Sequence, residues 1–394
     1  MPRFQRVTIH SHKADAVKRF HPWIFSGAVQ QVPKEVEEGD TVEVYTTKGE
    51  YLALGHYAGG NIAIKVLAFH NEPVDSLEAL FMQRFTQALA LRRQIGLADS
   101  PDTTCYRLIN AEGDGLPGLI VDWYNGAAVV QAYSVGMTRQ MDLIQRCLQT
   151  IYGDALTTIY DKSGAIAGQR VPAQPHRLGD QTQVMVTENG HPFTVNWVEG
   201  QKTGFFLDQR DHRQLLAHYA TGRRVLNTFC YSGGFSVYAV QAGAALVDSV
   251  DSSSRAIAWA EENVALNNPH QVPHRAIAAD VFDFLKHHDG EYDVVILDPP
   301  AFAKNLSSRH SAVMAYKRLN QLAFDRLQPG SLVFTFSCSQ VVSPDLFQGA
   351  VMAGAIESGR RIRVLHHLTQ PADHPVSIYH PEGLYLKGLV LAVD

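Results

Sequence analysis

The chain has 394 residues, with 34 Lys and Arg against 39 Asp and Glu, and four cysteines. Its length predicts two or three domains, and its net charge of −5 argues weakly against a nucleic-acid binder, because phosphate contacts need Lys and Arg. The cysteines are far apart and form no C-x-x-C pair, which excludes a disulfide framework and a zinc site of the usual spacing. No run of about 18 apolar residues and no signal-peptide core occurs, so we expect a cytoplasmic protein with no metal and no membrane partner.

Residues 1–72 are predicted to form a small β-barrel. Alternating runs such as TVEVYTTKGEYLALGHYA and NIAIKVLAF are separated by turn residues, which is typical of short strands in a barrel. Residues 1–34 hold six basic residues and one acid, a net +5, so the rest of the chain carries −10. A solvated basic face and a surface for nucleic acid both explain this charge.

Residues 73–198 are predicted to form a central α+β domain. The stretch LEALFMQRFTQALALRRQI places apolar residues at helical spacing, which indicates a helix with one buried stripe. Asn-Gly at 125–126 and again at 189–190 lies between apolar runs, the strongest short signal for a β-hairpin. MDLIQRCLQTIYG lies between these hairpins and is predicted to be a helix.

Residues 199–394 are predicted to form an α/β domain with a doubly wound, Rossmann-like parallel sheet. VLNTFC, LVDSVD, YDVVILD and LVFTFSCS are nearly continuous apolar runs, and helical segments separate them. Ligands of such sheets bind beyond the carboxyl ends of the strands. Function is therefore expected where each run stops.

The first three runs end in residues that suit a nucleoside without a phosphate. Gly233-Gly234 opens a helix after the first run, but the G-x-G-x-x-G pattern of dinucleotide sites is absent. Asp251 follows Gly233 by 18 residues, where a carboxylate can accept both ribose hydroxyls. Asp280 and Val281 suit the amino edge and the face of an adenine. A plain turn for the glycines and a helix cap for Asp251 are the structural alternatives.

The fourth and fifth runs end in Asp298-Pro299-Pro300 and in Cys338. In a doubly wound sheet these strands follow the first one in space, so Asp298 and Cys338 are expected in the same crevice, beside the nucleoside. A lone cysteine in a strand is otherwise a core residue. Its position here favours chemistry.

Taken together, several motifs resemble the bacterial ribosomal RNA large subunit methyltransferase I family, whose members make 5-methylcytosine in 23S RNA. The motifs are HPWIFSGAV, KTGFFLDQRDHR, VLNTFCYSGGF, VDSVD, LDPPAF, FTFSCS and PEGLYLKG, and the likeness covers nearly the whole chain. It implies a PUA-like RNA-binding barrel, a central domain and a class I methyltransferase domain that uses S-adenosylmethionine. Asp-Pro-Pro alone is not specific, because related enzymes that methylate exocyclic amines also carry it.

The resemblance also implies roles for individual residues. Cys338 is the nucleophile that adds to carbon 6 of cytosine, and Asp298 holds or protonates the N3 and amino edge. Ala301 stands where two-cysteine relatives carry a second cysteine, and Cys230 is a rival nucleophile. The implied cofactor contacts are Phe205, Asp208, Asn227, Tyr231, Gly233, Asp251, Ser252, Asp280 and Val281. The implied RNA contacts are Arg210, Pro299 and Pro300, with Arg3, Arg6, Lys18, Arg19 and Trp23 on the barrel.

Two other functions remain open at this point. The same cofactor site would serve an RNA methyltransferase that modifies a guanine or adenine amino group through Asp298. A chain that binds RNA without catalysis would be a ribosome assembly factor. The expected partner is 23S ribosomal RNA or an assembly intermediate, and a homodimer is compatible with the sequence, which does not determine the oligomeric state. For Phe205 and Trp23, packing is the alternative to a binding role.

Overall fold

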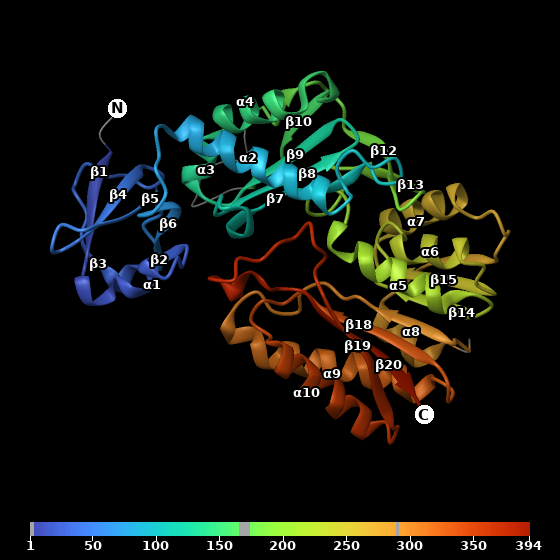
Figure 1. Ribbon diagram of the computed structural model, residues 1–394. Coiled ribbons are helices and arrows are strands. Elements are labelled where there is room, and N and C mark those ends of the chain that lie inside the picture. Colours follow the sequence, from blue (N-terminus) through green and yellow to red (C-terminus); the bar gives the residue numbers. More distant parts are fainter. Residues whose placement is uncertain (1–3, 165–173, 289–290) are drawn as a thin grey trace. The chain divides into compact units, whose positions relative to one another are not determined.

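The computed structural model of this protein describes residues 4–164, 174–288 and 291–394 (Figure 1). It divides into two compact units, each of which is made from several segments of the chain. The first contains Met1–Val186, Val195–Leu207 and Ala372–Gly383, and the second contains Thr187–Thr194, Asp208–Pro371 and Leu384–Asp394. Among the helices of the described residues, none combines the length and apolar character needed to cross a membrane.

The first unit begins with a six-stranded sheet of order β2-β6-β5-β4-β1-β3. Its strands are β1 (Gln5–Ile9), β2 (Trp23–Phe25), β3 (Val29–Gln31), β4 (Thr41–Thr46), β5 (Tyr51–Tyr57) and β6 (Ile62–Phe69), and helix α1 is Asp15–Lys18. Alternate residues point inward, and Val7, Val42 and Ile64 share one buried core. The predicted N-terminal β fold is present, with the short helix α1 added to it.

A five-stranded sheet of order β11-β10-β9-β8-β7 forms the rest of the first unit. The strands are β7 (Cys105–Asn110), β8 (Leu119–Tyr124), β9 (Ala127–Ala132), β10 (Thr158–Asp161) and β11 (His176–Leu178), with helices α2 (Leu77–Gln94), α3 (Val135–Arg139) and α4 (Met141–Tyr152). The predicted turn is present, because Asn125 and Gly126 have φ of 42° and 99°. The short helix α3 was not predicted.

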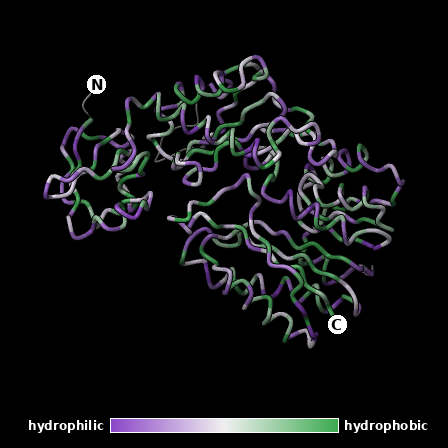
Figure 2. Tube along the Cα trace, viewed as in Figure 1, coloured by the Kyte–Doolittle hydropathy of each residue, from purple (hydrophilic) through white to green (hydrophobic). Residues whose placement is uncertain are grey.

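The second unit contains a seven-stranded sheet of order β16-β15-β14-β17-β18-β20-β19. Its strands are β14 (Arg224–Thr228), β15 (Leu246–Asp251), β16 (His274–Ala278), β17 (Val294–Leu297), β18 (Leu332–Ser337), β19 (Ile362–Thr369) and β20 (Lys387–Val393). Helices α5 (Arg210–Ala220), α6 (Gly234–Gln241), α7 (Ser254–Leu266), α8 (Val281–His287), α9 (Arg309–Arg326) and α10 (Pro344–Glu357) accompany them. Figure 2 shows long hydrophobic stretches along these strands.

The tip of a separate hairpin also belongs to the second unit. Strands β12 (Gln183–Glu188) and β13 (His191–Asn196) pair with each other. Asn189 and Gly190 have φ of 50° and 82°, as the Asn-Gly signal predicted.

The strand register brings the sequence motifs to one edge of the seven-stranded sheet. Thr228 lies opposite Leu297 on β17 and opposite Val250 on β15, and Leu297 lies opposite Thr335 on β18. These strands are parallel, so their carboxyl ends lie together. After β14 the chain adds β15 and β16 on one side of β14, and then adds β17 and β18 on its other side. The carboxyl ends of β14 and β17 therefore form a topological switch point. The predicted doubly wound sheet is therefore confirmed.

Candidate active site

Asp298 and Cys338 each follow directly after a buried strand. Asp298 comes after β17 and Cys338 after β18, and both side chains are partly exposed. Because Leu297 lies opposite Thr335 in a parallel pair, Asp298 is level with Phe336, and Cys338 stands two residues further along. The two side chains that the sequence assigned to catalysis thus follow neighbouring strands at the same edge.

Hydrogen bonds hold the loop around Cys338 against the Asp-Pro-Pro loop. The hydroxyl groups of Tyr316 and Ser339 lie 3.0 Å apart, and the backbone N–H of Ala303 donates to Ser339 Oγ at 3.4 Å. The N–H of Ser339 also donates to Ser337 Oγ at 3.4 Å. Burial raises the pKa of Tyr316, so its hydroxyl stays protonated and can donate. This network fixes the backbone on both sides of Cys338.

Lys387 supplies a buried positive charge at the same loop. It begins β20, lies opposite Ser337 on β18, and is 7% exposed. Its Nζ donates to the carbonyl oxygens of Ser339 and Val342, both at 2.7 Å. Burial lowers the pKa of Lys387 to about 8, and the nearby charge of Cys338 acts in the opposite direction. The sequence analysis quoted PEGLYLKG but gave Lys387 no role. The pattern that could have indicated a role is a lysine at the start of an otherwise apolar strand.

The loop after β14 has the backbone of a ligand-binding turn. Phe229, Tyr231 and Gly233 have φ of 53°, 47° and 77°. Two of these are non-glycine residues in the left-handed region, a strain that persists only where the surroundings hold it. A Cβ at Gly233 would lie 3.0 Å from Cα of Ala260, so a glycine is needed here. The Tyr231 N–H donates to Asp251 Oδ2 at 3.1 Å and joins this loop to the end of β15.

Three more of the residues assigned to the cofactor, Asp280, Ser252 and Asn227, lie at the carboxyl ends of strands of the same sheet. Asp280 caps α8 by accepting from the N–H of Asp283 at 3.0 Å, and Ser252 is exposed beyond β15. Asn227 donates to Ser236 Oγ at 2.9 Å, while its buried Oδ1 has no hydrogen-bond partner among the described residues. A nucleoside ligand fits these features. They are the acceptor Asn227 Oδ1, the turn at Gly233 and the Asp251 carboxylate at the end of β15.

Cys230 is a packing residue. It is 6% exposed and shares a small apolar cluster with Ile257 and Ala260. Burial raises the pKa of the Cys230 thiol, and the carboxylate of Asp251 raises it further, so the reactive thiolate is disfavoured. Cys105 and Cys147 are also buried, which leaves Cys338 as the partly exposed cysteine of the four. Among the described residues, no group of three or more His, Cys, Asp or Glu side chains could hold a metal ion.

The three residues of the KTGFFLDQR motif with assigned roles, Phe205, Asp208 and Arg210, are buried. Phe205 belongs to the first unit, whereas Asp208 and Arg210 belong to the second. The Tyr385 hydroxyl donates to Asp208 Oδ2 at 2.7 Å. Arg210 Nε lies 3.5 Å from Oε2 of Glu188, which is itself fully buried. Their assigned roles toward cofactor and RNA stay predictions.

On the small β domain, the residues assigned to RNA differ in how they are held. Arg6 lies over the ring of Tyr45, and Lys18 pairs with Glu50 at 2.8 Å. Arg19 is exposed. Trp23 is half-buried, and its indole N–H donates to Glu112 Oε1 at 2.8 Å. The assignment to Arg3 falls outside the described residues.

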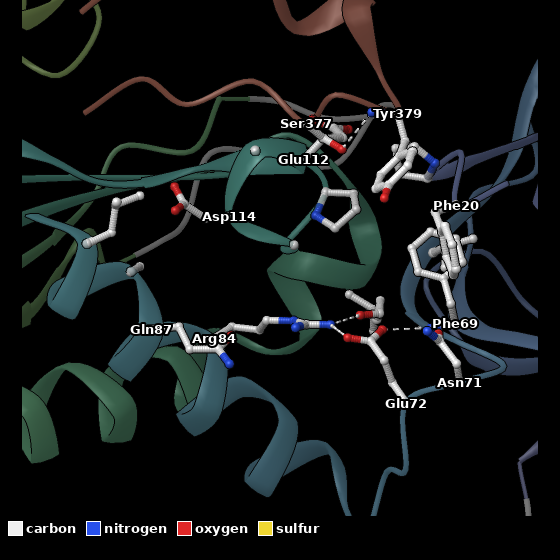
Figure 3. Close-up of a pocket in the computed structure, with 18 residues that line it drawn as sticks. Phe20, Phe69, Asn71, Glu72, Arg84, Gln87, Glu112, Asp114, Ser377 and Tyr379 are labelled. Atoms are coloured by element: carbon white, nitrogen blue, oxygen red, sulfur yellow. Dashed lines mark hydrogen bonds and ion pairs between the residues drawn. The ribbon is translucent and has the colours of Figure 1, made fainter. Parts of the chain in front are cut away.

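A pocket of about 510 Å³ lies within the first unit (Figure 3). The rings of Phe20 and Tyr379 stand together on one side, with centroids 5.2 Å apart. Below these rings in the view, Arg84 reaches Glu72 at 2.7 Å, and the N–H of Phe69 donates to the same carboxylate at 2.9 Å. Arg84 and Glu72 therefore already pair with each other, and the other two acidic lining residues, Glu112 and Asp114, pair with Lys65 and Arg92.

Comparison with known proteins identifies the family. Residues 112–378 match a model described as S-adenosylmethionine-dependent methyltransferase, and residues 7–69 match a PUA-like domain. The chain is 40% identical over 384 residues to ribosomal RNA large subunit methyltransferase I of Aeromonas hydrophila, with 95% of each chain covered. It is 37% identical over 399 residues to the protein of that name from Shewanella frigidimarina, with 98% of this chain and 99% of the relative covered.

Solved structures agree over the full length. A candidate SAM-dependent methyltransferase from Streptococcus mutans superposes with a TM-score of 0.84 at 25% identity, covering 99% of this chain and 100% of the other. The methyltransferase-like protein SMU.776, solved with SAH, gives 0.85 at 25% identity and the same coverage. S-adenosylmethionine is therefore the cofactor, and the chain belongs to the ribosomal RNA large subunit methyltransferase I family of S-adenosylmethionine-dependent methyltransferases.

Proposed function

We propose that this protein methylates carbon 5 of a cytosine in 23S ribosomal RNA through a covalent adduct at Cys338. The observation that carries the proposal is that Cys338, the partly exposed cysteine, and Asp298 follow neighbouring parallel strands. The printed names of the curated relatives support ribosomal RNA of the large subunit as the substrate. The PUA-like domain supports a separate RNA-binding part.

The electronic structure of cytosine explains the need for a thiolate. Carbon 5 is too weak a nucleophile to accept a methyl group directly. When the Cys338 sulfur bonds to carbon 6, carbon 5 becomes enamine-like and its electron pair can attack. S-adenosylmethionine supplies an activated methyl group on a sulfonium. The proton on carbon 5 then leaves, the bond between sulfur and carbon 6 breaks, and the thiolate is restored.

Asp298 acts on the opposite edge of the same ring. As a carboxyl group that follows four apolar residues, it can hold the N3 and amino edge of cytosine and share a proton with N3 as the adduct forms. Ala301 provides no thiol for product release, so a different group must remove the proton from carbon 5. The target base must leave its stack to enter this site.

Replacement of Cys338 tests the covalent mechanism. With ribosomal RNA from a strain that lacks the gene, Cys338→Ala should lower the transfer of tritium from labelled cofactor into RNA by at least about 100-fold. Cys147→Ala, which changes a buried cysteine of the first unit, is the control and should retain activity. RNA with fluorine on carbon 5 of cytosine has no proton to lose there and should accumulate an adduct only when Cys338 is present.

Mass spectrometry of nucleosides from the methylated RNA tests the base. A 5-methylcytosine product agrees with the proposal, whereas an N-methylated guanine or adenine would reject it in favour of chemistry at Asp298. Full activity of Cys338→Ala would reject the adduct. Calorimetry that detects no binding of S-adenosylmethionine at millimolar concentration would instead favour a non-catalytic role.

A further inference from the structure

We propose that Lys387 is a positioning residue that holds the Cys338 loop in place and favours the thiolate form of Cys338 by its positive charge. The inference deepens the proposed function, because it concerns the same nucleophile. It can nevertheless be tested on the protein without RNA.

The geometry places the Lys387 ammonium directly at the loop. Lys387 lies opposite Ser337, the residue before Cys338. Its Nζ donates to the carbonyl oxygens of Ser339, the residue after Cys338, and of Val342. Two of the three N–H groups of the ammonium thus donate to the backbone after Cys338, and these bonds hold the positive charge of Lys387 near the cysteine. If Lys387 contributed only its aliphatic chain to the core, its Nζ would not have to lie at these two carbonyl oxygens.

Burial makes this charge effective. Lys387 is 7% exposed, so water screens its field far less than at the surface. The pKa of Lys387 is lowered to about 8 by burial, while the charge of Cys338 opposes this decrease. Below pH 8 the lysine is therefore mostly an ammonium. The interaction is mutual: a thiolate that favours the ammonium is itself favoured by the ammonium to the same extent.

Two other titratable groups at this edge of the sheet, Tyr316 and Asp298, do not supply this charge. Tyr316, on α9, is neutral because burial raises its pKa, and its interaction with the Cys338 charge raises that pKa further. Asp298, at the end of β17, is an acid and would oppose a second negative charge. Lys387 is the cation that faces Cys338 from β20.

The role appears at two points of the reaction. Before attack, the thiol gives its proton to water and the sulfur keeps the electron pair beside the ammonium. That pair then forms the bond to carbon 6. At release, the pair returns to sulfur as the bond breaks, and the same ammonium stabilises the departing thiolate. Lys387 gains and loses no proton in either step.

Alkylation of Cys338 by iodoacetamide from pH 6 to pH 10 measures the thiolate directly, with mass spectrometry of the Cys338 peptide. Lys387→Met should raise the pH midpoint of alkylation by about one pH unit and slow the reaction about ten-fold at pH 7. Lys162→Met is the matched control. Lys162 is a lysine of the first unit whose Nζ donates to the Gly200 carbonyl at 2.6 Å and whose pKa burial lowers to about 8. It should leave the midpoint unchanged.

A second variant separates charge from loop support. Lys387→Gln keeps an N–H donor for the carbonyl oxygens but has no charge, so it should shift the midpoint as Lys387→Met does, and it serves as the test if Lys387→Met does not fold. An unchanged midpoint in the folded variant, even with a different maximal rate, would overturn the proposal. If the midpoint shifts as expected but Cys338→Ala still methylates RNA, the proposed function fails while the inference about the thiolate stands.

Discussion

Replacing the buried Glu188 by Gln should lower the free energy of unfolding of the second unit more than the same replacement of an exposed glutamate does. Glu188 is fully buried at the end of β12 and accepts two parallel bonds from Arg213, at 2.8 and 2.7 Å. The Tyr238 hydroxyl donates to the same carboxylate at 3.0 Å. Glutamine has nearly the same shape but no charge, so the buried guanidinium of Arg213 would lose the negative charge of this carboxylate. Breaking one side of such a buried pair costs roughly 3–5 kcal/mol.

Urea unfolding of the purified protein measures this loss. With a slope of about 3 kcal/mol per molar urea, the midpoint of the second unit should fall by about 1 M or more. Hydrogen exchange of peptides from α5 and α6 locates the effect, because Arg213 lies on α5 and Tyr238 on α6. Glu291→Gln is the control. Glu291 pairs with Arg224 at 2.9 Å, but the two side chains are 64% and 38% exposed, so the change should stay within about 0.5 kcal/mol.

A double variant distinguishes the cause. Adding Arg213→Met to Glu188→Gln removes one of the two buried guanidinium groups that face position 188, so part of the lost stability should return. Equal effects of Glu188→Gln and Glu291→Gln would refute the reasoning. A double variant that is less stable than Glu188→Gln alone would refute it as well, because packing rather than charge would then explain the loss.

Three further changes have definite expected results. Gly233→Ala should lower stability by about 1–3 kcal/mol and weaken S-adenosylmethionine binding in calorimetry, whereas Gly49→Ala, also at positive φ but with open space, should cost about 1 kcal/mol and leave binding intact. The pKa of His56 is lowered to about 4 by burial, so the unfolded chain binds more protons between pH 6.5 and 4. Stability should therefore fall by up to roughly 3 kcal/mol as pH decreases through that range, and His56→Leu should flatten this slope in urea titrations at each pH. Tyr316→Phe should cost about 1 kcal/mol and slow methylation, since the Ser339 hydroxyl loses one of its two hydrogen-bond partners, and unchanged activity would reject that role.

Much of the second unit could be predicted because its signals are local. Four nearly continuous apolar runs define the central strands, and the motifs at their ends follow from chain order in a doubly wound sheet. The Asn-Gly turns at 125–126 and 189–190 were also predicted, because the left-handed backbone they adopt favours those residues.

The features that the sequence analysis missed depend on contacts between distant residues. The sheet continues through β20 and β19, which run antiparallel to their neighbours and place Lys387 beside Ser337. Glu188 and Arg213 are ordinary polar residues in the sequence, and only their burial together makes them significant. The segment Ala372–Gly383 lies between β19 and β20 yet belongs to the first unit, where Asp373 accepts from the N–H of Arg107 at 3.0 Å. Local patterns carry no information on such pairings.

The comparison of Cys230 with Cys338 shows why the position of a nucleophile cannot be judged from its residue type. Each cysteine follows a parallel strand of the same seven-stranded sheet, and each was a candidate from the sequence. Cys230 packs in an apolar cluster beside the carboxylate of Asp251, and both surroundings make its thiolate costly. Cys338 is partly exposed and has the Lys387 ammonium beside it. A reactive thiolate needs a nearby cation and access to the base. For Cys338 the cation is Lys387, about 50 positions further along the chain, and Cys230 has an acid in its place.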